Sequence, residues 1–286
     1  MLPPLAGRSL NMPWQIPAPR GFPPRFEKRV EVEAEDNRRI RILSGFNRPR
    51  TRALADHLSA SDFHEVEPIT MASSRCMRVA RIRIIEQGAA LLEDTTSLAG
   101  LSFVTIVPPK WFVSEGELLT GGVPDFKKQL RGYLHRAGIH DTIDGLIIGH
   151  FEAAYCRQPS TGQVGFAFHV HLVCNDTARD VFERMRPFRS LKWTVDVAQP
   201  LRIEPIKEEK NDLRSVLGYC FKAFWHCRSI DIHPEGLDDI RRPHGSRLPN
   251  IALCRELLWR QNRGLAETSI VVGTRDMAQA FRHTWS

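Results

Sequence analysis

The sequence lacks the features by which several classes of protein are recognised. No run of about 18 apolar residues occurs, so we expect no membrane-spanning helix and no membrane partner. The six cysteines include no pair at Cys-x-x-Cys spacing, which argues against a zinc ribbon or a redox dithiol. The N-terminal stretch is broken by prolines and has no apolar core of a secretory signal. Together these absences favour a reducing, cytoplasmic location.

Lysine is scarce, and arginine takes its place. Eight of the 40 basic residues are lysine and 32 are arginine, and the formal net charge is +7. Because arginine binds phosphate with a planar fork and stacks on bases, this excess favours nucleic acid as the partner. The alternative is an ordinary solvated basic surface. The candidate phosphate contacts are Arg48, Arg50, Arg52, Arg241, Arg242 and Arg247.

A helicase P-loop is also absent, so any unwinding would need a partner.

The apolar pattern is clearest between residues 96 and 228, and it predicts an α+β fold. Strands are expected over 101–109, 144–155 and 165–175, with one or two more within 193–209. Helices are expected over 125–138, 177–188 and 211–226. This order favours a central, mainly antiparallel sheet with helices packed on it.

The flanking segments are predicted to be additions to this domain. Residues 1–95 are interpreted as an arm and an appendage, and residues 229–286 as a basic C-terminal extension. Helices are expected near 49–60, 78–93 and 249–261, although the second of these stretches could equally begin as a strand.

Two histidines one residue apart lie in the strand-like run FHVHLVCN at 168–175. Alternate side chains of a strand share a face, so His169 and His171 should point the same way. If the hairpin turns between residues 160 and 161, Glu152 faces His169 and His150 faces His171. Two imidazoles and a carboxylate suit a divalent cation. A slip of one residue would turn Glu152 away, and the histidines could instead simply bond to neighbours.

The third feature is a tyrosine, one of only three in the chain. Tyr219 and Lys222 are three residues apart in an expected helix, where such positions lie on the same side. A phenol is a weak nucleophile, but a nearby ammonium group and a metal-polarised phosphate would make its attack feasible. The alternatives are a packing tyrosine and an exposed helix lysine.

The order of three motifs resembles a known family. FVTIVP (103–108), HVHLV (169–173) and YCFK (219–222) are similar to the three motifs of the HUH endonucleases, most closely the single-tyrosine rolling-circle replication initiator (Rep) proteins. The resemblance covers roughly residues 99–228. It implies an HUH/Rep-like fold with a ferredoxin/RRM-like core. It also implies that His169, His171 and Glu152 hold Mg²⁺ or Mn²⁺.

The resemblance further implies that Tyr219 attacks single-stranded DNA or an origin hairpin, assisted by Lys222. The products would be a 5′-phosphotyrosine link and a free 3′-hydroxyl that starts rolling-circle replication of a plasmid or phage. A host helicase and polymerase would be the partners. A second tyrosine of some relatives would fall at residue 223, which is alanine here.

Four alternatives remain open at this point. A relaxase or a single-tyrosine transposase would share the chemistry. A histidine-triad nucleotide hydrolase would need a third histidine where Val173 stands. A noncatalytic nucleic-acid-binding module would need exposed aromatic side chains on the sheet. Phe103, Phe166 and Phe168 are the candidates, but the last two should lie opposite the histidines, in the core.

Overall fold

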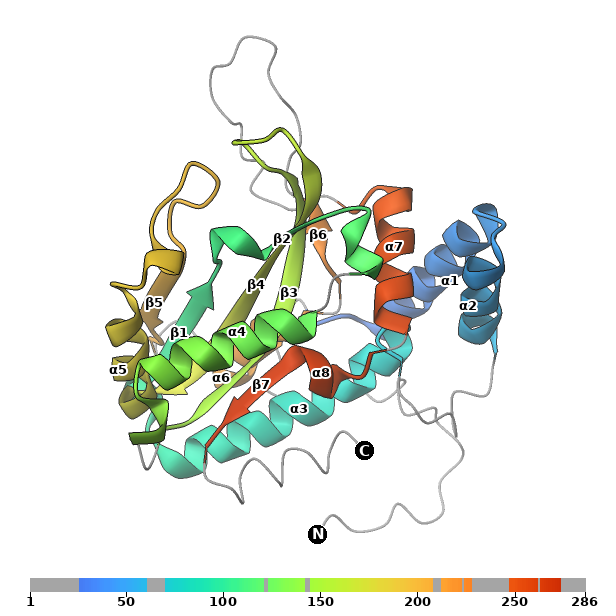
Figure 1. Ribbon diagram of the computed structural model, residues 1–286. Coiled ribbons are helices and arrows are strands. Elements are labelled where there is room, and N and C mark those ends of the chain that lie inside the picture. The colour runs from blue at the N-terminus through green and yellow to red at the C-terminus, as the bar shows by residue number, and fades with distance from the viewer. Residues whose placement is uncertain are drawn as a thin grey trace, which may run out of the picture.

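A computed structural model describes residues 26–60, 70–120, 123–141, 145–207, 212–222, 224–227, 247–261 and 263–273. The described strands form one seven-stranded sheet with helices packed on it (Figure 1). Its main path runs β5-β1-β4-β3-β6, with β2 paired to β4 and β7 paired to β3. All pairings but the short one between β3 and β6 are antiparallel, which confirms the expected α+β class. The strands are β1 Leu101–Ile106, β2 Phe112–Ser114, β3 Ile147–Arg157, β4 Val164–Asn175, β5 Leu201–Pro205, β6 His226–Cys227 and β7 Ser269–Val272.

The long hairpin of β3 and β4 has the predicted register. Glu152 lies opposite His169, and His150 lies opposite His171. Gly162 closes the turn with a φ of 68°, a left-handed conformation that glycine adopts without steric cost. The turn residues and the alternation of the strands therefore lead to one register, and the prediction is confirmed.

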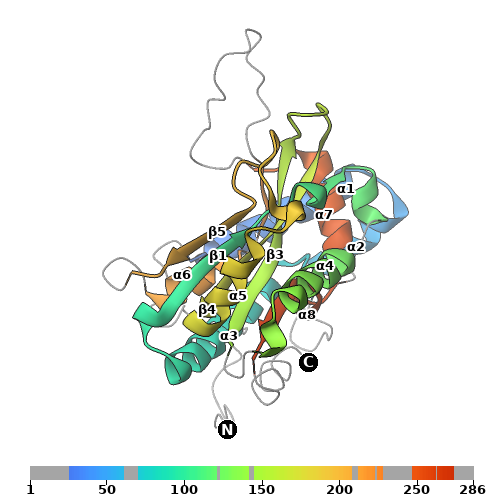
Figure 2. The ribbon, with the colours of Figure 1, turned by 60° about the vertical axis from the view of Figure 1, so that its left-hand side comes forward.

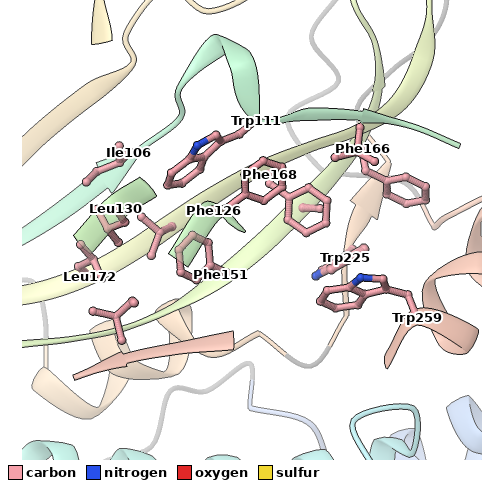
Figure 3. Packing of buried hydrophobic residues seen from close by; sticks show 14 of the residues in the cluster. Ile106, Trp111, Phe126, Leu130, Phe151, Phe166, Phe168, Leu172, Trp225 and Trp259 are labelled. Atoms are coloured by element: carbon pink, nitrogen blue, oxygen red, sulfur yellow. The ribbon is translucent and has the colours of Figure 1, made fainter. Parts of the chain in front are cut away.

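One face of the sheet carries a large aromatic core, which Figure 3 shows from close by. Phe166 and Phe168 are buried there, as the alternation of β4 predicts. The ring centroids of Phe126 and Phe168 are 5.1 Å apart, and those of Trp225 and Trp259 are 5.3 Å apart. Large aromatic side chains dominate the energetics of such a core and hold the sheet rigid from this side.

The opposite face, which carries the histidines, is covered by two helices, α3 (Ser74–Thr95) and α6 (Leu213–Cys220). Apolar residues of both helices form one cluster with Ile148 of β3 and Val173 of β4. The stretch around 78–93 is therefore helical, and Ser73 caps it by accepting a hydrogen bond from the backbone N–H of Cys76.

One expected element needs correction, and one helix was not expected. The expected helix 211–226 ends at Cys220, where Phe221 leaves the helical conformation at φ −108° and ψ 57°. The stretch 193–209 contains one described strand, β5, in agreement with the expected one or two. The helix α1 (Arg29–Gly45) was not expected, because two of its four buried residues are charged and this hides the apolar helical period. The buried residues are Val32, Asp36, Arg39 and Leu43.

The other expected helices are present with small shifts of their ends. They are α2 Pro49–Ser59, α4 Val123–Arg136, α5 Asp176–Met185 and α7 Asn250–Gln261. Asn175 caps α5 by accepting a hydrogen bond from the backbone N–H of Ala178. The described residues also form the short helix α8 Leu265–Thr268 and the 3₁₀ turns Leu98–Gly100, Pro109–Trp111, Glu117–Leu119, Ile139–Asp141 and Arg189–Leu191.

The described helices outside 96–228 pack into the same core as the sheet. Leu54 of α2 and Leu257 of α7 belong to the aromatic cluster, and Ile85 of α3 belongs to the cluster on the other face. The division of the chain at residues 95 and 228 stays a prediction about autonomous units, and residues 1–25 lie outside the described part. Within the described residues, no helix is long and apolar enough to cross a membrane.

Candidate metal centre

Glu152, His169 and His171 come together on the sheet face covered by α3 and α6. The Oε2 atom of Glu152 lies 3.6 Å from Nε2 of His169 and 3.8 Å from Nε2 of His171. One ligand atom from each residue lies within 4.8 Å of the others, and all three side chains are buried. Ligand atoms bound at about 2.1 Å to one ion lie roughly 3–4 Å apart, so this group could bind a metal ion with little movement.

The second nitrogen of each imidazole is already engaged. Nδ1 of His169 lies 3.2 Å from the carbonyl oxygen of Ala167. Because a carbonyl only accepts, Nδ1 carries a proton and donates it to Ala167, and Nε2 faces Glu152. Nδ1 of His171 lies 3.0 Å from the hydroxyl of Thr105 on β1. Metal-binding histidines are typically oriented by such outer hydrogen bonds.

Glu152 is held as a carboxylate by Lys222. The ammonium Nζ of Lys222 lies 3.2 Å from Oε2, and the backbone N–H of Lys222 donates to Oε1 at 3.2 Å. Burial alone would raise the pKa of Glu152, but Lys222 and the two imidazoles hold that pKa well below its usual value. Burial would likewise lower the pKa of Lys222, but Glu152 raises it above its usual value. Both groups are therefore charged at neutral pH.

Tyr219 lies beside this group, in the last turn of α6. Its side chain is half exposed, whereas the three candidate ligands are buried. Its ring centroid is 5.0 Å from that of His171 and 3.7 Å from Nζ of Lys222. The two residues meet as expected, but by a different geometry, because Lys222 follows the end of the helix and is not part of it. The chain turns at Phe221 and brings the ammonium back over the phenol ring.

His150 shares the face of the histidines but is not a member of the candidate metal group. Its Nε2 lies 2.9 Å from the hydroxyl of Thr268 in α8. Burial lowers the pKa of His150 to about 3, so the ring is neutral. The structure therefore favours a hydrogen-bonded role for His150 over that of an additional metal ligand.

Sequence reasoning missed two neighbours of the group. Thr105 is the first of these, and its hydroxyl orients His171. Phe103, two residues earlier on the same face of β1, stacks on His171 with the rings 5.4 Å apart and 24° from parallel. The signal for both lies in the pairing of β1 with β4, in which Thr105 lies opposite His171. The sequence alone offers no turn that fixes this long-range register.

Comparisons of the chain with protein-family models, with curated proteins and with solved structures found no match. The resemblance to the HUH endonucleases therefore stays a prediction from the motifs. The arrangement of the residues supports a chemical statement of its own. A buried Glu-His-His group that could bind a metal ion lies next to a half-exposed phenol and a partly buried ammonium group.

Proposed function

We propose that the protein nicks and rejoins single-stranded DNA with Tyr219 as the nucleophile. The observation that carries the proposal is the position of the Tyr219 ring, 5.0 Å from the ring of His171 in the Glu-His-His group. A phosphate that reached the group from the solvent side would lie next to the exposed phenol. Glu152, His169 and His171 would hold Mg²⁺ or Mn²⁺, and the outer hydrogen bonds of both imidazoles support this role.

Each residue has a defined role in the proposed reaction. A bound divalent ion would polarise the scissile phosphate and offset the charge that develops on its oxygens. The phenol oxygen of Tyr219 attacks the phosphorus in line, and its proton passes to solvent. The bond between phosphorus and the 3′ oxygen breaks, which gives a 5′-phosphotyrosine link and a free 3′-hydroxyl. Lys222, 3.7 Å from the ring centroid of Tyr219, stabilises the phenolate.

The covalent link conserves the energy of the broken bond, so the reverse attack by a 3′-hydroxyl rejoins the strand. This chemistry suits the initiation of rolling-circle replication of a plasmid or phage, where the 3′-hydroxyl would prime a host polymerase and a host helicase would unwind the duplex. A relaxase and a single-tyrosine transposase use the same step. A replication initiator, a relaxase and a transposase would differ in the DNA site that they recognise, such as an origin or a hairpin, and not in this chemical step.

The proposal is tested by the covalent adduct. Single-stranded DNA labelled at its 3′ end would be incubated with the protein and Mn²⁺ and separated on a denaturing gel. The label should migrate with the protein, because the fragment downstream of the nick carries the phosphotyrosine. The adduct should be lost with EDTA and in Tyr219→Phe. It should persist in the matched control Tyr133→Phe, since Tyr133 is a buried residue of α4 in the core on the other face of the sheet.

A second candidate is a noncatalytic module that binds nucleic acid. The half-buried Phe103, stacked on His171, is the observation that favours it. Phe166 and Phe168 are fully packed in the core and offer no stacking surface. If wild-type protein binds the DNA but forms no adduct with Mg²⁺ or Mn²⁺, the nuclease proposal fails and the binding module takes its place.

A further inference from the structure

A dense run of arginines extends from the second half of α1 into α2. Between Asp36 and Asp56 the chain carries six arginines and no acidic residue. Four of the six, Arg41, Arg48, Arg50 and Arg52, are exposed. The nucleic-acid contacts expected from composition included three of these four residues. Like charges gathered along one segment repel each other, so an anionic partner is the simplest reason for such a run.

A groove opens beside this run, between α1 and the beginning of α7. Its volume is about 520 Å³, within the range of sites that bind ligands. The space at Gly45 is open, since a Cβ atom placed there would have no neighbour within 4 Å. The groove is lined by Arg38, Arg41, Ile42, Gly45, Phe46 and Asn250.

Arginines from both ends of the sequence surround this groove. Arg48, two residues after Phe46, is the N-cap residue of α2, and α2 packs against both α1 and α7. Arg247, three residues before α7, has a side chain that is 72% exposed. Arg241 and Arg242 lie outside the described residues. Two segments about 200 residues apart in sequence thus bring guanidinium groups to the same place.

One carboxylate faces these arginines and does not neutralise them. Glu35 lies 3.2 Å from Arg38 and 3.9 Å from Arg247, and it also bonds to the buried Arg39. Arg38 is further fixed by the carbonyl of Leu248, at 3.5 Å. Arg38 and Arg247 share Glu35, and Arg41 adds a further guanidinium to the lining, so the groove keeps a net positive charge. The shared carboxylate holds Arg38 in position at the lining.

The apolar part of the lining indicates which nucleic acid fits. Ile42 and Phe46 are half-buried and present apolar surface between the arginines. A duplex turns its phosphates outward and keeps its bases stacked inside, so it would leave this surface without a partner. A single strand offers phosphates and base faces together, and a basic groove with an aromatic side chain is typical of single-strand binding.

We propose that the groove between α1 and α7 is a binding site for single-stranded DNA, separate from the Tyr219 site. Arg41 and Arg48 contact phosphates, and the bases lie over Ile42 and Phe46. In both views α1 and α7 lie on the other side of the molecule from α6, the helix that carries Tyr219 (Figures 1 and 2). The proposal does not depend on nicking, because no residue of the groove belongs to that centre.

The test measures how binding depends on salt. Fluorescence anisotropy would follow a labelled 30-nucleotide oligothymidine from 50 to 200 mM salt, in EDTA and with Tyr219→Phe protein, so that nicking does not contribute. Each phosphate contact to a single strand adds about 0.7 to the slope of log K against log salt. Arg41→Ala/Arg48→Ala should therefore lower the slope by about 1.4 and weaken binding at 50 mM salt roughly 50-fold.

The matched control removes two exposed arginines elsewhere, Arg131→Ala/Arg186→Ala, with the same change of net charge. This control should show the same slope of log K against log salt as protein in which the groove is not substituted. Equal slopes for the two double variants would overturn the proposal. Equal competition by an unlabelled duplex would overturn the single-strand assignment. Displacement by poly-glutamate as effective as by oligothymidine would assign the groove to an acidic protein segment.

Discussion

Lys222 and a metal ion would share one carboxylate oxygen. Nζ of Lys222 lies 3.2 Å from Oε2 of Glu152, the oxygen that also faces both imidazoles. The substitution Lys222→Met keeps much of the side chain's bulk and removes its charge. We expect the metal-free protein to become less stable and its affinity for a divalent ion to increase.

The size of the increase follows from the geometry. A metal–oxygen distance of about 2.1 Å, added to the 3.2 Å between Nζ and Oε2, places the ion no farther than about 5 Å from Nζ. At about 5 Å the repulsion between charges of +1 and +2 is about 1.7 kcal/mol even at the dielectric constant of water. Removal of Lys222 should therefore strengthen Mn²⁺ binding about 15-fold.

The same substitution, Lys222→Met, should make the metal-free protein less stable. Breaking a buried ion pair typically costs 3–5 kcal/mol, because one charge is left uncompensated. The backbone N–H of residue 222 still donates to Oε1 of Glu152, and the lysine side chain is 18% exposed. We therefore expect a smaller loss, about 2 kcal/mol, in the free energy of unfolding by urea. Saturating Mn²⁺ should recover it, since an ion bound 100-fold above its Kd adds about 2.7 kcal/mol.

Isothermal titration of wild-type and Lys222→Met protein with Mn²⁺ at pH 7 measures the predicted change. Lys128→Met removes an exposed lysine of α4 and should bind Mn²⁺ like the wild type. Urea unfolding curves would show that Lys222→Met protein is folded. If the folded variant binds Mn²⁺ with unchanged or weaker affinity, the ion does not lie next to Oε2 of Glu152 together with Lys222.

Three further predictions concern the surroundings of the metal centre. Thr105→Val removes the hydroxyl that orients His171 and should weaken Mn²⁺ binding 10- to 100-fold by calorimetry, whereas Thr105→Ser should retain it. Gly149→Ala would push a Cβ atom into the backbone of β4 at His171. It should lower the free energy of unfolding, measured in urea, by about 1–3 kcal/mol. Gly116 has open space around it, so Gly116→Ala should change this free energy by less than about 0.5 kcal/mol. Because the pKa of Glu152 is lowered by folding, its carboxylate stabilises the protein fully above the unfolded pKa and less as the pH falls through the folded value. Unfolding curves below about pH 4 should therefore show a loss of stability that Glu152→Gln lacks, and parallel curves would contradict it.

The register of the central hairpin was predictable because two local signals agree. The turn QPSTGQ fixes where the chain reverses, and the apolar residues on either side of it alternate. Together they determine which residue of β3 faces His169. Glu152 could thus be paired with the histidines before any coordinates were known, and it lies there in the structure.

The failures concern features without a local signal. The apolar spacing of 211–226 continues past Cys220, but the N–H of Lys222 bonds to Glu152 in place of a helical carbonyl. The helix ends where this tertiary contact forms, and the sequence near residue 220 gives no sign of the contact. Thr105 and His171 were placed on different strands correctly, but their contact depends on strand pairing across 66 residues. The strand β7, at the end of the described residues, is four residues long and offers too short a pattern to recognise.

The hairpin also determines the order in which the site can be assembled. Glu152 and His169 lie on neighbouring strands joined by one short turn, so their contact closes early and at a small entropic cost. Tyr219 and Thr105 come from distant parts of the chain, so their contacts with His171 need the pairing of β1 with β4 and the docking of α6. The three candidate ligands therefore come from one hairpin, whereas Tyr219 reaches them only through tertiary packing. An ion captured by the early hairpin would raise the rate of folding, a change that refolding in the presence and absence of Mn²⁺ measures directly.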